Sequence, residues 1–225
     1  MMQSVWPFWT LGKFSQFIIS AQLQDHRIRI ESETHGDILQ ERFEDSYLNL
    51  TIKTMLLLKY YNQNCSHIPY MLKADDDVFL NTKNLYRQVV QNTKDDLLIG
   101  YLFCDKKPIR VQESTWYIPE SVYSKETYPQ HLNGPGYLMS LSTAHKLLRT
   151  ARDVPLFMYE DVYTTGILAK AAGIQCSFLK VTFQPTTLKF SPSRGFDDPV
   201  MDITFIYNWK HIQSISITNK HLLIG

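Results

Sequence analysis

Apolar positions along the chain follow two spacings, which predict helices and strands in alternation. A three- and four-residue spacing predicts an amphipathic helix over 45–61. Short apolar runs predict strands at 68–74 and 97–101, with a helix over 81–91 between them. Strands that alternate with helices favour an α/β fold with a mostly parallel sheet flanked by helices.

The rest of the pattern predicts less regular elements. Polar residues at 16–27 predict a helix, and 28–39 reads as a loop that feeds a short strand. Residues 128–140 combine a glycine-rich turn with a strand, and glycine there would let the backbone approach a ligand closely. An ordinary turn is the alternative. A further helix is predicted to begin at Glu160 and to stop at Gly173.

Three consecutive carboxylates, Asp75, Asp76 and Asp77, follow the strand predicted at 68–74. Side chains alternate on an extended backbone, so Asp75 and Asp77 point one way and Asp76 the other. Two oxygen ligands on one face suit a divalent cation, which would also relieve the repulsion between neighbouring carboxylates. A solvated acidic turn is the alternative.

A second acidic pair, Glu160 and Asp161, stands where the later helix should begin. Such a pair is often only a cap, because the helix dipole favours negative charge in the first turn. A carboxylate at this position is also well placed to stay ionised and to accept a proton from a bound hydroxyl. Both interpretations stay open on these residues alone.

Composition narrows the class of protein. The chain has 225 residues, 44% of them apolar, and we expect one domain over 1–225. Its net charge is +1 with no basic stripe, so nucleic acid is not an expected partner. We expect no signal peptide or membrane anchor. The three cysteines allow at most one disulfide, and sequons stand at Asn49 and Asn64, of which Asn64 is the better glycan acceptor.

Four stretches, in order, resemble the β-1,3-galactosyltransferase family, including its β-1,3-N-acetylglucosaminyltransferase relatives. The resemblance covers roughly 8–218. The stretches are Glu31 to Thr54, similar to the family's E-x-x-x-(Y/H)-x-DI…DSY-x-NLT-x-KT block; Lys73 to Phe79, similar to K-x-DDD-(V/A)-(F/Y); Tyr128 to Ser140, similar to YP…G-x-GY-(V/L)-x-S; and Glu160 to Tyr163 with Gly166, similar to EDV-(Y/F).

The resemblance implies an inverting glycosyltransferase with a GT-A (Rossmann-like) fold. The expected reaction moves galactose or N-acetylglucosamine from UDP-galactose or UDP-N-acetylglucosamine, with Mn²⁺, to a glycan acceptor on protein or lipid in β-1,3 linkage. Family members reside on the luminal side of the Golgi membrane. The implied roles are a general base for Asp161, metal ligands for Asp77 and Asp75, and substrate binding for Asp76, Glu160, Trp116, Gly134 and Gly136.

The chain also departs from the family pattern. The first strand and an R-x-x-IR-x-TW segment have no counterpart, so we expect a domain that is shorter at its N-terminus, with an incomplete donor site and no anchor of its own. Pro135 replaces a usual glycine and Leu132 a frequent cysteine. His211 and His221 lie only near the position of the family's metal-binding histidine.

Functions from other classes fit less well. A nucleoside triphosphatase would need a G-x-x-x-x-G-K-[ST] loop to hold phosphates, and the sequence has none. An EF-hand would need D-x-D-x-D-G spacing, which is also absent. The alternative that stays open is a non-catalytic family member that keeps Asp77 and Asp161 but binds the donor poorly.

Overall fold

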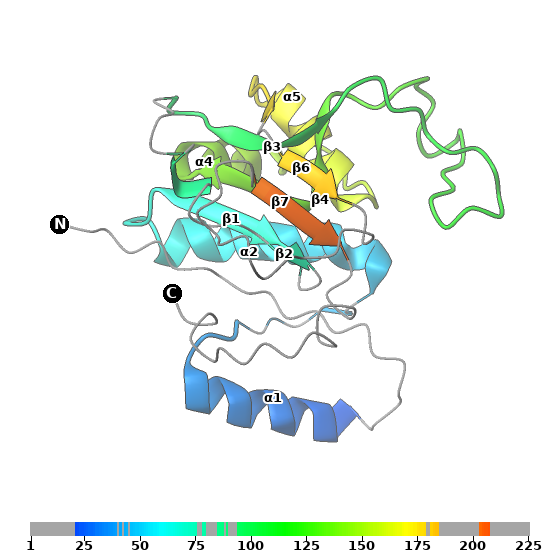
Figure 1. Cartoon of the computed structure of the whole chain (residues 1–225). Coiled ribbons are helices and arrows are strands. Elements are labelled where there is room, and N and C mark those ends of the chain that lie inside the picture. Colours follow the sequence, from blue (N-terminus) through cyan, green and yellow to red (C-terminus); the bar gives the residue numbers. More distant parts are fainter. Residues whose placement is uncertain are drawn as a thin grey trace.

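A computed structural model of the chain describes residues 21–39, 41, 43–44, 46–75, 78–79, 85–87, 89, 94–178, 181–184 and 203–207. The first helix, α1, spans Ala21–His35 (Figure 1). The prediction of a loop and a short strand over 28–39 is therefore wrong, because the helix continues to His35 and Gly36 ends it with a positive φ of 66°. None of the described helices is long and apolar enough to cross a membrane.

The helix predicted over 45–61 is confirmed. It begins as a 3₁₀ turn, η1 (Tyr47–Asn49), and continues as α2 (Leu50–Asn64). The apolar spacing points Leu57, Leu58 and Tyr61 inward, where each is buried. Of the helix predicted over 81–91, the described residues 85–87 and 89 are helical, and the other positions lie outside the described residues.

The main sheet has four strands in the order β1-β4-β3-β5 (Figure 1). Its strands are β1 (Tyr70–Ala74), β4 (His131–Ser140), β3 (Leu98–Phe103) and β5 (Ser177–Phe178). The strands predicted near 68–74 and 97–101 are thus confirmed.

The prediction of a mostly parallel sheet is wrong for these strands. β4 pairs antiparallel with both β1 and β3, and only β3 and β5 pair in parallel. The reason is the connection over 104–130, which contains no helix and returns the chain antiparallel, whereas a parallel connection usually needs a crossover helix. Figure 1 shows this connection as a long loop that extends away from the sheet. The fold is a mixed α/β arrangement.

A second sheet has three strands in the order β2-β7-β6. They are β2 (Val78–Phe79), β7 (Ile203–Tyr207) and β6 (Val181–Gln184). β2 pairs antiparallel with β7, and β6 pairs in parallel with it. This sheet therefore joins the residues just after the first acidic segment to the C-terminal part of the chain.

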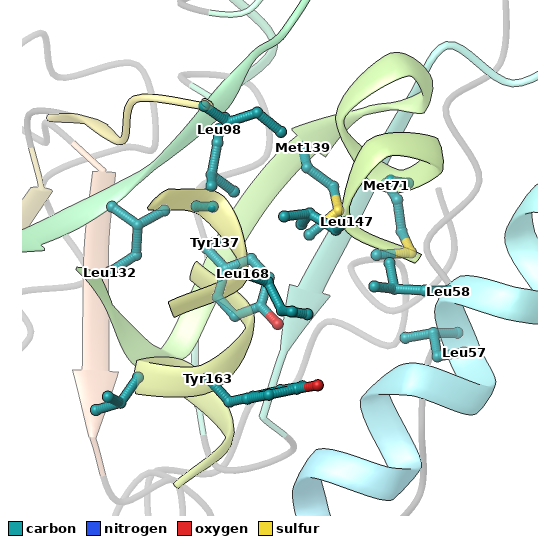
Figure 2. Packing of buried hydrophobic residues seen from close by; sticks show 14 of the residues in the cluster. Leu57, Leu58, Met71, Leu98, Leu132, Tyr137, Met139, Leu147, Tyr163 and Leu168 are labelled. Atoms are coloured by element: carbon teal, nitrogen blue, oxygen red, sulfur yellow. The ribbon is translucent and has the colours of Figure 1, made fainter. Parts of the chain in front are cut away.

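Two apolar clusters cover opposite faces of the main sheet, because neighbouring residues on a strand point to opposite faces. On β3, Leu98 belongs to the larger cluster and Ile99 to the smaller. On β4, Met139 and Leu138 divide in the same way. The larger cluster is completed from α2, α4 (Leu141–Thr150) and the π-helix η2 (Val162–Leu168) by Leu57, Leu58, Leu147, Tyr163 and Leu168 (Figure 2). Leu85 and Val89 complete the smaller cluster. The sheet is thus a middle layer.

The predicted glycine-rich turn is also wrong, because Gly134 and Gly136 lie inside strand β4. Gly136 pairs with Ala74 of β1, and the Pro135 carbonyl accepts a hydrogen bond from the backbone N–H of Asp75 at 3.0 Å. The pairing with β3 jumps between Gly100 and Leu102, so this part of β4 bulges away from β3. The glycines therefore belong to a strand that lies alongside β1, at the end of β1 where the acidic segment begins.

The helix predicted to begin at Glu160 and to stop at Gly173 is confirmed. Residues 160–161 open it, η2 makes its middle, and α5 (Ala169–Ala171) ends it. Gly173 has a positive φ of 72°, which glycine adopts without steric cost. A π-helical stretch is rare and is frequent at functional sites. The sequence reasoning did not identify α4, although Ser140 caps it by accepting from the backbone N–H of Thr143.

Candidate active site

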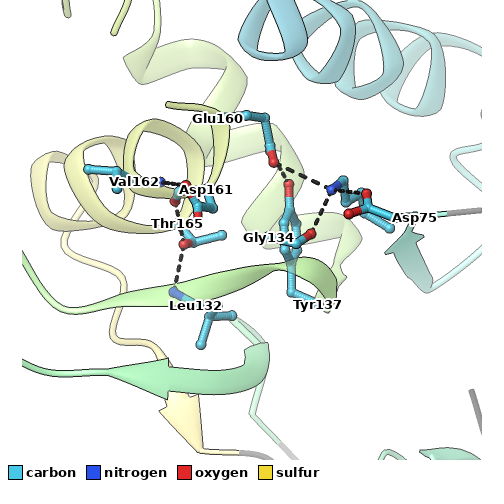
Figure 3. A network of polar contacts seen from close by, with 9 residues as sticks. Asp75, Leu132, Gly134, Tyr137, Glu160, Asp161, Val162 and Thr165 are labelled. Atoms are coloured by element: carbon cyan, nitrogen blue, oxygen red, sulfur yellow. Dashed lines mark hydrogen bonds and ion pairs between the residues drawn. The ribbon is translucent and has the colours of Figure 1, made fainter. Parts of the chain in front are cut away.

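The two acidic segments meet beside the bulged part of β4. Asp75 follows β1 directly, and Glu160 and Asp161 open the helix that leads into η2. Figure 3 shows Tyr137 of β4 reaching Glu160, with Asp161 and Asp75 on either side of Gly134. The structure therefore brings together four residues that the sequence assigns to a site: Asp75, Gly134, Glu160 and Asp161.

Lys73 holds the centre of this cluster. Its Nζ donates to Asp75 Oδ1 at 2.7 Å and to the Gly134 carbonyl at 2.6 Å, and it lies 3.6 Å from Glu160 Oε2. Burial works against the positive charge, but Glu160, Asp75 and Asp161 outweigh it and raise the pKa of Lys73. Lys73 is therefore a protonated, largely buried cation among carboxylates.

Glu160 is buried, with 6% of its surface exposed. The Tyr137 hydroxyl donates to Glu160 Oε1 at 2.5 Å, and Lys73 lies against Oε2. Burial raises the pKa of Glu160, while Lys73 and the Tyr137 hydroxyl favour its ionised form. The sequence predicts sugar contact for Glu160, whereas both of its carboxylate oxygens have partners within the protein.

Asp161 differs from its neighbour in being only half-buried. Its Oδ1 accepts from the backbone N–H of Val162 at 2.8 Å, as in a helix cap. A Cβ added to Gly134 would lie 3.4 Å from Asp161 Oδ2, an ordinary van der Waals distance, so the Asp161 carboxylate lies directly beside this glycine. The Asp161 carbonyl accepts from the Thr165 hydroxyl at 2.6 Å, and that hydroxyl accepts from the Leu132 N–H at 2.8 Å (Figure 3). The helix start is thus tied to β4.

An aromatic group borders the cluster. The centroid of the Trp116 ring lies 5.3 Å from that of the Tyr47 ring and 6.0 Å from that of the Tyr159 ring. Trp116 is 49% exposed. Burial raises the pKa of Tyr47, and the negative charge of Asp161 raises it further. Trp116 thus packs against Tyr47 and against Tyr159, the residue that precedes Glu160.

The carboxylates predicted to hold Mn²⁺ are described only in part. Asp75 is 43% exposed and presents a hard oxygen donor at a strand end, which suits Mn²⁺. Asp76, Asp77, His211 and His221 lie outside the described residues. No three His, Cys, Asp or Glu side chains among the described residues come together as a metal site. The fit to the metal therefore rests on Asp75 alone.

Three site residues escaped the sequence reasoning: Lys73, Tyr137 and Tyr47. Lys73 had a usable signal, because residues two apart on a strand point to the same face and Asp75 is two residues on. Tyr137 is the tyrosine of the G-x-GY motif, but nothing local joins it to Glu160, which its hydroxyl reaches from a strand 23 residues away. Gly136, which was predicted to bind substrate, belongs to the β1–β4 ladder.

Other sequence expectations have structural outcomes. Cys65, Cys104 and Cys176 are free thiols. Asn49 is half-buried and donates to the Glu44 carbonyl at 2.9 Å, whereas Asn64 is exposed at the end of α2.

Comparison with known proteins agrees with these motifs. The profile of a family described as "Galactosyltransferase" matches residues 12–180. The chain is 30% identical over 214 residues to "Beta-1,3-galactosyltransferase 2" of Mus musculus, and the aligned region covers 87% of this chain and 47% of that protein. It is 38% identical over 149 residues to "N-acetyllactosaminide beta-1,3-N-acetylglucosaminyltransferase 3" of Homo sapiens, covering 66% of this chain and 40% of that protein.

A third relative is "UDP-GlcNAc:betaGal beta-1,3-N-acetylglucosaminyltransferase 7" of Rattus norvegicus, 37% identical over 146 residues, 64% of this chain and 36% of that protein. The chain spans about half the length, or less, of these curated relatives. The family match includes both acidic segments and most of the chain. This chain therefore belongs to the galactosyltransferase family.

Proposed function

We propose that the chain carries the catalytic part of an inverting GT-A-fold glycosyltransferase. In this proposal it moves galactose or N-acetylglucosamine from a UDP-sugar to a glycan acceptor on protein or lipid, in β-1,3 linkage. Membership of the family supports it, and the relatives include both a galactosyltransferase and an N-acetylglucosaminyltransferase by name. The observation that carries it is the meeting of Asp75, Gly134, Glu160 and Asp161 around Lys73.

Asp161 is the proposed general base. Its half-buried carboxylate, next to Gly134, would accept the proton of the acceptor hydroxyl. The acceptor oxygen then forms its bond to the anomeric carbon from one face. On the opposite face the bond from that carbon to the diphosphate oxygen breaks, and its electron pair leaves with UDP. One displacement of this kind inverts the anomeric configuration.

Asp77 and Asp75 are the residues proposed to hold Mn²⁺. When bound, the metal would act as a Lewis acid on the departing diphosphate. Asp75 would contribute from the end of β1, where its partly exposed side chain is tied to Lys73. Asp76 is proposed to bind ribose or sugar hydroxyls.

Substrate contacts are also proposed for Trp116, Gly134 and Gly136. Glu160 is the fourth residue for which the sequence predicts a substrate contact. Trp116 is half-exposed, and the exposed face of its ring would pack against the apolar face of a sugar ring. Gly134 lies beside Asp161, and a residue without a side chain would let a substrate approach the backbone closely there. By family, the proposed location is the lumen of the Golgi.

The test measures transfer and donor binding on the same protein. Full-length chain with Mn²⁺ is offered UDP-galactose or UDP-N-acetylglucosamine and β-linked galactose or N-acetylgalactosamine acceptors, and the product linkage is determined. Calorimetry measures UDP binding to the wild type, to Asp77→Asn, and to Asp153→Asn as an exposed control. We expect transfer, with Mn²⁺-dependent UDP binding lost only in Asp77→Asn. Absence of transfer together with weak or absent UDP binding would favour the non-catalytic alternative, which binds the donor poorly. Absence of transfer, with or without UDP binding, would contradict the proposal.

A further inference from the structure

Lys73 lies between the two acidic segments, and the chemistry proposed above gives it no role. An ammonium group has three donors, and those of Lys73 face partners on three parts of the fold. They are Asp75 at the end of β1, the Gly134 carbonyl on β4, and Glu160 at the start of the helix. Lys73 therefore connects the strand that leads to the aspartates with the helix that carries Asp161.

The Lys73–Glu160 pair is withdrawn from water. The side chain of Lys73 is 13% exposed and that of Glu160 is 5% exposed. A second lysine pair, Lys146 with Asp96, is 40% and 35% exposed. Burying two charges has a desolvation cost, and replacing such a pair by apolar residues is often neutral or stabilising. A purely structural need does not readily explain the buried pair, which favours a functional one.

Glu160 is held from both sides. Its Oε1 accepts from the Tyr137 hydroxyl on β4, and its Oε2 faces Lys73 on β1. With both oxygens bound by protein groups and almost no exposed surface, the carboxylate has little left to offer a sugar. Its contacts instead fix the first turn of the helix against two strands.

We propose that Lys73 and Glu160 are positioning residues that hold Asp161 in register with Asp75 across β4. The proposal rests on the function proposed above. It assigns Glu160 to the support of the site in place of the sugar contact expected from the sequence.

The physical reason is adjacency. Glu160 and Asp161 are consecutive in a helical turn, where neighbouring side chains point about 100° apart. Anchoring Glu160 inward to Lys73 and Tyr137 therefore leaves Asp161 turned toward Gly134. General-base catalysis needs this alignment, and a misplacement of about 1 Å can cost about 10²-fold in rate.

The test is a double-mutant cycle on the full chain. Lys73→Met and Glu160→Gln are each expected to lower kcat by about 10- to 100-fold, with smaller effects on the KM for donor and acceptor. The kcat loss of the double variant should be smaller than the product of the two single losses, because both changes break the same Lys73–Glu160 contact. Tyr137→Phe, which deletes only the hydroxyl contact to Glu160, should lower kcat less. Lys146→Met, which breaks the more exposed pair with Asp96, serves as the matched control and should leave kcat unchanged.

Hydrogen exchange gives a readout that does not depend on activity. Exchange over 160–168 should become faster in Lys73→Met and Glu160→Gln, and stay unchanged in Lys146→Met. If the wild type shows no transfer, the proposed function fails while the exchange experiment still decides this inference. Three results would each overturn the positioning role of Lys73 and Glu160. The first is a double variant whose kcat loss equals the product of the two single losses. The others are a rise in KM with kcat unchanged, and unaltered exchange over 160–168.

Discussion

Thr51 offers a stringent test of how α2 supports the site. It lies in the first turn of α2, is 2% exposed, and its hydroxyl donates to the carbonyl of Phe157 at 2.7 Å, 106 residues away. Thr51→Val keeps the shape of the side chain and removes the donor. The change costs the net hydrogen bond and leaves the Phe157 carbonyl in a buried place without this partner, together about 1–3 kcal/mol. For a domain of this size each kcal/mol corresponds to about 2–4 °C in Tm.

Thermal unfolding monitored by circular dichroism measures this effect. Thr34→Val is the matched control, because the Thr34 hydroxyl also donates to a backbone carbonyl, that of Ile30 at 2.6 Å, but in an exposed position. Water replaces that bond, so the control should change stability by less than about 0.5 kcal/mol. If Thr51→Val unfolds at the same temperature as Thr34→Val, the contact between α2 and the segment before Glu160 is not a stabilising one.

Three further predictions concern packing, modification and the acceptor. Gly166→Ala should lower Tm, because the new Cβ would lie 3.0 Å from the His131 Cβ and 3.2 Å from the Pro129 ring, and neither group can rotate away. An unchanged Tm would argue against this close approach. In a chain routed through the secretory pathway, peptide mass spectrometry should find glycan at the exposed Asn64 and little at Asn49, and the reverse would contradict the argument from burial. Trp116→Ala should raise the KM for the acceptor about tenfold and leave the affinity for UDP unchanged, because it removes about 1–2 kcal/mol of aromatic contact. A change in the affinity for UDP alone would place Trp116 at the donor site instead.

Elements with strong local signals could be predicted from the sequence. The helix at 50–64 followed from apolar spacing, β1 from an apolar run, and the helix end at Gly173 from a glycine that adopts a positive φ. Each of these signals acts between residues close in the chain. The two acidic segments were singled out through family motifs, and the structure links Asp75 and Asp161 through Lys73 and Gly134.

What failed depended on contacts between distant segments. Gly134 and Gly136 resemble turn residues, but pairing with β1 keeps them in a strand. The parallel sheet was wrong because strand direction depends on the connection over 104–130, whose length alone does not indicate its path. The burial of Glu160 needs Tyr137 and Lys73, which no local pattern joins to it. The roles of Asp76 and Asp77 stay predictions.

The most direct test of the account separates proton abstraction from donor binding. Asp161→Asn should lower the rate of transfer by about 10²-fold or more, because it removes the positioned base, while Mn²⁺-dependent UDP binding stays near the wild-type value. Asp77→Asn should lose both. Full transfer by Asp161→Asn, measured beside wild type at saturating donor and acceptor, would contradict the account and leave the Glu160–Asp161 pair as a helix cap.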